Sequence, residues 1–159
     1  MASGDLDEYK IRNLLQAGAP IDAFGVGTQL ATSADAPFLG AVYKMVELDI
    51  HGIKRFTAKF SEDKPSLPGA KQVFRAGHRD VIARSGECGS GEALLRPVIL
   101  GGKLVEPLPD LPQVRERAAR SVAALAPALR QLEVVEPWPV ILSRELRELI
   151  ERTRANLGQ

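Results

Sequence analysis

The sequence predicts an α/β fold, and three regional patterns carry that prediction. Residues 1–48 combine a helix with a short buried strand, residues 49–108 are β-rich with glycine and proline turns, and residues 109–159 are mostly helical. The chain has 159 residues, of which 45% are hydrophobic and 26% are charged. This composition is ordinary for a globular domain, so a hydrophobic core is expected.

A helix followed by a strand opens the first region. Asp5 or Asp7 can cap the helix, and Gly18 stands where a left-handed C-terminal cap belongs. Residues 21–26 form a short apolar run bounded by turn residues, which we interpret as a buried strand. A helix leading into a buried strand indicates part of a parallel sheet or barrel.

Apolar runs separated by turn residues predict hairpins and one isolated strand in the second region. The predicted strands are residues 41–50 with 53–60, residues 80–83, and residues 95–100 with 103–106. The Gly101-Gly102 pair suits a primed turn, in which both central residues take positive φ.

Two helices are expected in the third region. Asp110 can cap the first, whose apolar residues recur at intervals of three and four. Pro127 lies inside this pattern, and an interior proline costs about 3 kcal/mol, so the helix should kink or break there. The last helix is predicted to start near Ser143.

Charge and cysteine content exclude several classes of function. The net charge of +1 argues against a nucleic-acid binder, and no apolar run approaches the roughly 20 residues of a membrane span. Cys88 is the only cysteine, which excludes an intrachain disulfide and fits a reducing, cytoplasmic location. A single small anionic ligand is still compatible with this charge, because a few backbone amides can hold one phosphate.

The segment Phe24-Gly25-Val26-Gly27-Thr28 suggests such a ligand. Glycines at the end of a strand let the backbone approach a phosphate, and Thr28 can donate a further hydrogen bond. We expect a bulky residue at Gly27 to block that approach and to strain a positive φ angle. An ordinary strand-to-loop turn is the alternative interpretation, because the motif alone is weakly specific.

Other polar residues are weaker candidates. Asp5, next to Gly4 before the first helix, could accept hydrogen bonds from sugar hydroxyls, or it could simply cap the helix. Lys44 could reach an anion, although an outward-facing strand lysine is the simpler interpretation. His51 and His78 fall beside turns without a partner that suggests a relay, and the sequence contains no metal-binding spacing.

Several segments together resemble the nicotinate phosphoribosyltransferase family, in the family's order and at its approximate spacing. They are residues 3–9 (SGDLDEY), 19–28 (APIDAFGVGT), 39–47 (LGAVYKMVE), 67–75 (LPGAKQVFR), 94–98 (LLRPV), 106–109 (EPLP) and 140–143 (VILS). The resemblance covers nearly the whole chain from Ser3 onward.

The resemblance implies an enzyme of NAD salvage that couples nicotinate to 5-phosphoribosyl 1-pyrophosphate, with ATP hydrolysis and Mg²⁺. It implies an irregular (β/α) phosphoribosyltransferase barrel followed by a β-rich region and C-terminal helices, usually as a homodimer. Residues 1–48 would be the C-terminal portion of the barrel. The implied substrate-binding residues are Gly4, Asp5, Gly25, Val26, Gly27, Thr28 and Lys44.

The family's phosphorylated histidine and its main nicotinate-binding residues would lie upstream of Ser3. We therefore expect a C-terminal fragment or split subunit that contains no catalytic residue of its own and is inactive when isolated. Its partner would be the missing N-terminal part of the barrel or a second copy. The alternatives are a non-catalytic phosphate- or nucleotide-binding module, and a truncated remnant that acts only in association.

Overall fold

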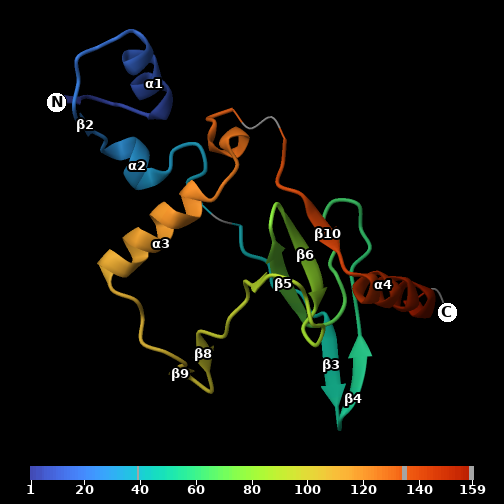
Figure 1. The fold of residues 1–159 in the computed structure, drawn as a ribbon. Helices are drawn as coiled ribbons and strands as arrows, with labels where there is room; N and C mark the ends of the chain where they lie inside the picture. Colours follow the sequence, from blue (N-terminus) through green and yellow to red (C-terminus); the bar gives the residue numbers. More distant parts are fainter. Residues whose placement is uncertain (39, 134–135, 158–159) are drawn as a thin grey trace. The chain divides into compact units, whose positions relative to one another are not determined.

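A computed structural model describes residues 1–38, 40–133 and 136–157. The chain forms two compact units, one of residues 1–42 with 131–134 and the other of residues 43–130 with 135–159 (Figure 1). The mixed α/β class predicted from the sequence is confirmed. Leu39, which belongs to one of the segments quoted above, lies outside the described residues.

The first unit is built on a strand, a helix and a second strand. Strand β1 (Ala2–Ser3) leads through a turn into helix α1 (Glu8–Gln16), and strand β2 (Phe24–Gly25) leads into the short helix α2 (Thr28–Thr32). The two strands pair in parallel, with Ala2 opposite Phe24 and Ser3 opposite Gly25. The parallel arrangement predicted from the helix and strand pattern is therefore confirmed.

Both ends of α1 follow from local chemistry. Of the two candidate caps, Asp7 is the one used, and its Oδ1 accepts from the amide of Lys10 at 2.7 Å. At the other end Gly18 takes a φ of +72°, and its amide donates to the carbonyl of Leu15 at 3.0 Å. The amide of Ala19 donates to the carbonyl of Leu14, which completes a Schellman motif.

The second unit contains a four-stranded sheet with the order β10-β6-β5-β7. Strands β5 (Lys71–Ala76) and β6 (Arg79–Arg84) form an antiparallel hairpin, β7 (Glu92–Ala93) pairs with β5, and β10 (Val140–Leu142) runs parallel to β6. Helix α4 (Arg144–Leu157) packs on β6. The buried apolar side chains of this unit include Phe74, Ala83, Leu146 and Leu149.

Two further hairpins and one helix complete this unit. The hairpins are β3 (Glu47–Ile50) with β4 (Ile53–Phe56), and β8 (Ile99–Leu100) with β9 (Lys103–Leu104). Gly101 and Gly102 both have positive φ, as expected of a primed turn. None of the helices in the described residues has the length and apolar character needed to cross a membrane.

The helix α3 (Leu111–Ala123) starts and stops where the sequence predicts. Asp110 and Gln113 form a reciprocal capping box at its start. The helix ends before Pro127, which instead begins a 3₁₀ turn (Pro127–Arg130). The predicted break and the predicted start of α4 after Ser143 are both confirmed.

The predicted strand boundaries need correction. The strand expected over residues 41–50 is limited to Glu47–Ile50, and the one expected over residues 21–26 is limited to Phe24–Gly25. Val42 and Met45 are exposed, because no strand in the described chain pairs with residues 40–45, and backbone pairing with the β4 side begins only at Val46. The local apolar pattern therefore predicted where the chain is extended. Pairing with a neighbouring strand decides how much of that extended chain belongs to a sheet.

The Arg75 and Asp80 side chains tie the β5–β6 hairpin together. Arg75 Nε and Nη2 donate to the two carboxylate oxygens of Asp80 at 2.9 and 2.7 Å. These hydrogen bonds hold the pKa of Asp80 below its ordinary value of 3.8. Asp80 is buried, and Arg75 also lies over the ring of Trp138.

Replacing Asp80 with asparagine should lower the free energy of unfolding at pH 7 by about 1–2 kcal/mol, since Asp80 is buried but half of Arg75 is exposed. Because the folded-state pKa of Asp80 is lowered, the contribution of the pair is complete above the unfolded-state pKa. It is lost as the pH falls through the folded-state pKa. Urea unfolding of the wild type and of Asp80→Asn between about pH 7 and pH 2 measures this loss of stability.

A matched control is Glu148→Gln, which removes an exposed ion pair with Arg144 and should leave stability unchanged. A wild type and an Asp80→Asn variant that lose stability in parallel on acidification would contradict this role for the pair.

Candidate functional site

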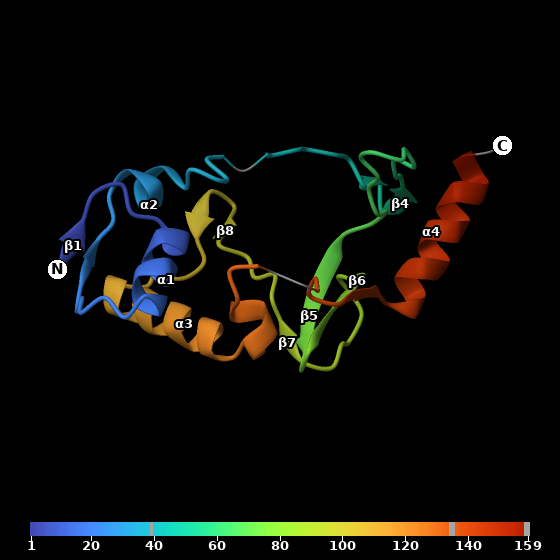
Figure 2. The ribbon, with the colours of Figure 1, turned by 90° about the horizontal axis from the view of Figure 1, so that it is seen from above.

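An open cleft of about 420 Å³ lies at the ends of the two parallel strands in the first unit. It is lined by two short segments, residues 3–6 and residues 25–28, which begin at the last residue of β1 and of β2. Figure 2 shows β1 with helices α1 and α2 of this unit from above. Because the strands are parallel, both segments emerge at the same edge, which is where ligands bind in many α/β proteins.

The first lining segment turns sharply at Gly4 and Asp5. Gly4 has a φ of +111° and Asp5 a φ of +44°, so two successive residues have positive φ. The carbonyl of Asp5 accepts a hydrogen bond from Lys10 Nζ at 2.6 Å. Asp5 carries the only ionisable side chain among the residues that line the cleft. A carboxylate in this position can accept hydrogen bonds from hydroxyl groups.

The second lining segment combines two glycines with a hydroxyl group. A Cβ atom on Gly25 would lie 3.3 Å from Ser3 Cβ, so the glycine allows the two strands to approach closely. A Cβ atom on Gly27 would meet nothing within 4 Å. Gly27 precedes α2 without a side-chain cap, and Thr28 is the first residue of that helix.

The backbone at Gly27 corrects one expectation. Its φ is −105°, so the positive φ angle expected from the sequence is wrong. Val26 and Gly27 connect β2 to α2, and they do so without a left-handed residue at position 27. A side chain at Gly27 would occupy this open space beside the cleft.

Lys44 belongs to the second unit, whereas the residues that line this cleft belong to the first. Its ammonium group donates to the carbonyls of Lys64 and Pro65 at 2.6 and 3.3 Å. It precedes β3 instead of lying within a strand, in contrast to the expected strand over residues 41–50. Its contacts in this structure hold the loop that precedes β5.

The two histidines occupy turns, as expected. His51 lies in the β3–β4 turn with a φ of +53°, and His78 lies in the β5–β6 turn. Cys88 is exposed. Within the described residues, no three histidine, cysteine or acidic side chains gather into a group that could hold a metal ion.

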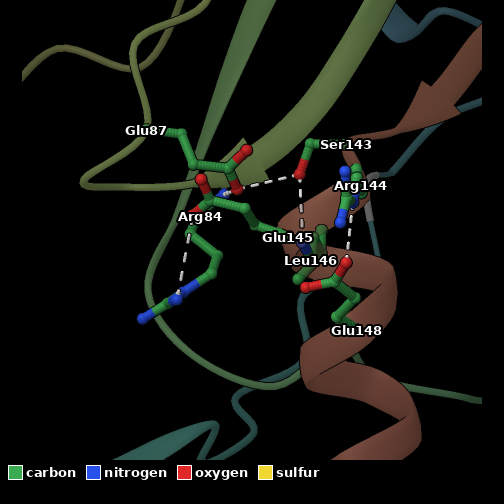
Figure 3. A network of polar contacts seen from close by, with 7 residues as sticks. All are labelled: Arg84, Glu87, Ser143, Arg144, Glu145, Leu146 and Glu148. Carbon is green, nitrogen blue, oxygen red and sulfur yellow. Dashed lines mark hydrogen bonds and ion pairs between the residues drawn. The ribbon is translucent and has the colours of Figure 1, made fainter.

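Sequence reasoning missed a polar cluster in the second unit, which Figure 3 shows at the start of α4. Glu87 Oε1 accepts from the amide of Arg84 at 2.7 Å and from Ser143 Oγ at 2.8 Å. Ser143 Oγ in turn accepts from the amide of Leu146, which caps the helix. The cluster thus fastens the loop after β6 to the first turn of α4.

Beside this cluster lies an open cleft of about 510 Å³ with balanced charge. It is lined by Arg84, Glu87, Arg144, Glu145, Glu148 and Arg152. Arg144 Nε donates to Glu148 at 2.8 Å, which lowers the pKa of Glu148 and raises that of Arg144. The sequence predicted a helix start near Ser143, but it could not predict the Glu87 contact, because that contact spans 56 residues along the chain.

The fold and the cleft define an α/β protein in which two parallel strands present glycine-containing turns to a common space. Residues 62–150 match the model of the nicotinate phosphoribosyltransferase C-terminal domain, so the chain belongs to that family. The resemblance inferred from the quoted segments is confirmed.

Relatives extend this match over almost the whole chain. Nicotinate phosphoribosyltransferase pncB2 of Mycobacterium tuberculosis (strain ATCC 25618 / H37Rv) is 39% identical, over 96% of this chain and 34% of the relative. The mouse nicotinate phosphoribosyltransferase is 30% identical, with the same two coverages. The crystal structure of human nicotinic acid phosphoribosyltransferase aligns with a TM-score of 0.66 and 25% identity, over 94% of this chain and 32% of that one. The chain thus spans about one third of the length of these relatives.

Two glycines that face the cleft make a matched pair for testing its geometry. Gly4→Ala should destabilise the first unit by about 1–3 kcal/mol, because its φ of +111° disfavours any L side chain. Gly27→Ala should be tolerated, since its φ is negative and its Cβ position is open. Amide hydrogen exchange within α1 and β2 measures the difference.

The comparison controls for space, because a Cβ atom at either glycine meets nothing within 4 Å. Equal protection of α1 and β2 in the two variants would show that the Gly4 turn is not the conformational constraint described above.

Proposed function

We propose that this chain forms the C-terminal third of a nicotinate phosphoribosyltransferase and supplies the part of the active site that binds the ribose phosphate. The observation that carries the proposal is the convergence of two turns, at residues 3–6 and 25–28, on one cleft. Each turn follows a strand of one parallel pair. Membership of the family supports the assignment of the substrate.

The cleft suits a phosphorylated sugar for chemical reasons. Gly25, Val26 and Gly27 offer backbone amides without bulky polar side chains, so a phosphate can approach the main chain closely. Thr28 adds a hydroxyl donor. Asp5, at the opposite lining segment, is the acceptor that ribose hydroxyls require.

In the complete enzyme the reaction would join nicotinate to 5-phosphoribosyl 1-pyrophosphate, giving nicotinate mononucleotide and pyrophosphate for NAD salvage. ATP hydrolysis would drive it, with Mg²⁺ accompanying the phosphates. The described residues do not fit a metal held by the protein, since the cleft provides a single carboxylate. In this proposal the ATP-dependent chemistry belongs to the part of the relatives' length that this chain does not span.

The partner in this proposal is that remaining polypeptide or a second copy of the chain, in the cytoplasm. Large apolar side chains are exposed in the second unit, including Leu100 at 72%, Leu104 at 52% and Leu111 at 83%. Exposed apolar side chains of this kind are expected where a further chain packs. The two-stranded parallel sheet also supports a partner, because parallel sheets are normally larger and covered.

A non-catalytic phosphate-binding module is the second candidate. It is favoured by one observation, which is that Asp5 is the only ionisable group lining the cleft. The cleft by itself can hold a ligand, but it contains no pair of groups for acid–base chemistry. Both proposals expect the isolated chain to be inactive. Only the transferase proposal expects turnover when the remaining polypeptide of the enzyme is added.

Substitution of Gly27 tests the assignment of the phosphate. In the enzyme completed by the remaining polypeptide, Gly27→Val should weaken binding of phosphoribosyl pyrophosphate, because a side chain would fill the open space beside the amides. Thr28→Val should weaken binding of phosphoribosyl pyrophosphate less than Gly27→Val, because it removes a single hydrogen bond. One hydrogen bond to a charged group is worth about 1.5–3 kcal/mol, or roughly ten- to a hundredfold in affinity. Isothermal titration calorimetry measures the affinity of both variants for phosphoribosyl pyrophosphate. Their affinity for nicotinate should stay unchanged.

Gly40→Val is the matched control, because its Cβ position is equally open and it does not line the cleft. Normal binding of phosphoribosyl pyrophosphate by a folded Gly27→Val protein would reduce residues 25–28 to a structural turn.

A further inference from the structure

The turn at Gly4 and Asp5 is held by a residue that does not itself line the cleft. Lys10 lies in the first turn of α1, and its Nζ donates to the backbone carbonyl of Asp5 at 2.6 Å. The same ammonium group lies 3.7 Å from the carboxylate of Asp7, the helix cap. Lys10 therefore bridges the strand end and the start of the helix.

This contact acts on an unfavourable backbone conformation. Asp5 has a φ of +44°, a left-handed conformation that costs energy for a residue with a β-carbon. Gly4 before it also has positive φ, but glycine adopts such angles freely. The conformation of Asp5 thus needs support from its surroundings, and a charge-assisted hydrogen bond to its own carbonyl provides it.

We propose that Lys10 is a positioning residue that fixes the left-handed conformation of Asp5 and so orients the Asp5 carboxylate in the cleft. This inference rests on the proposed function as far as the ligand is concerned. Within the described residues, no side chain other than Lys10 donates a hydrogen bond to Asp5. Loss of the Lys10 ammonium group would free Asp5 to rotate toward the common right-handed or extended conformations.

Two lysines in exposed ion pairs allow a controlled test. The side chain of Lys10 is 53% exposed beside Asp7, and that of Lys54 is 54% exposed beside Glu47 in the other unit. Lys10→Met and Lys54→Met each remove one exposed positive charge from such a pair. Lys10→Arg keeps the charge and the donor, so it should restore what Lys10→Met loses.

The first measurement is the three-bond coupling between the amide and α protons of Asp5, together with its carbon shifts, in the 159-residue chain. Lys10→Met should move these signals away from the left-handed values. Lys10→Arg and Lys54→Met should leave them in place. Unchanged Asp5 signals in Lys10→Met would overturn the proposal, whatever the ligand does.

The second measurement is the affinity for ribose 5-phosphate, with inorganic phosphate as the probe that lacks hydroxyls. Lys10→Met should weaken binding of ribose 5-phosphate several-fold and change phosphate binding less, because Asp5 serves the hydroxyls. An equal loss for both probes, or for Lys54→Met, would overturn the positioning role in favour of a general charge effect. A wild type that binds neither probe would refute the proposed function, and the Asp5 couplings would still decide the role of Lys10.

Discussion

The pairing of β1 with β2 is the constraint on which the candidate site depends. Only two residues of each strand pair, yet their parallel register brings Ser3 opposite Gly25 and sends both chains out at the same edge. The glycine at position 25 is part of this constraint, since a β-carbon there would crowd Ser3. Helix α1 is the connection that makes a parallel pair possible, and its Asp7 and Gly18 caps fix where the helix starts and stops. A shift of this register would separate the two lining segments.

The second unit is stabilised by different means. Its four-stranded sheet carries the buried Phe74 and Ala83, and the helix α4 on β6 carries Leu146 and Leu149, which are among the most buried side chains described. The Arg75 and Asp80 pair closes the central hairpin, and Glu87 with Ser143 fastens α4 to the sheet. None of these groups lines the cleft of the first unit. The family model matches residues 62–150, so it covers this sheet and not the candidate cleft, whereas the alignment with the relatives covers almost the whole chain.

Local chemistry in the sequence predicted helix ends and turns well, and pairing between distant segments poorly. Asp110, Pro127 and the Gly101-Gly102 turn act over a few residues, so their effects could be derived without the fold. The lengths of the strands could not be derived in this way, because residues 40–45 have the pattern of a strand but pair with no strand in the described chain. For the site, six of the seven expected residues line one cleft, whereas Lys44 is held by two loop carbonyls in the other unit. The role of Lys10 could not be predicted from the sequence, because its hydrogen bond to the Asp5 carbonyl depends on the left-handed turn at Asp5.

The most direct measurement of the central claim is a titration of the isotope-labelled chain with ribose 5-phosphate, followed by amide chemical shifts. If the cleft binds the ribose phosphate, the shifts will concentrate on Gly4, Asp5 and residues 25–28, and those at Gly27 and Thr28 will also respond to inorganic phosphate. The arginine-containing cleft beside α4, lined by Arg84, Arg144 and Arg152, serves as the internal comparison. Shifts confined to that second cleft, or spread over exposed arginines without saturation, would contradict the account.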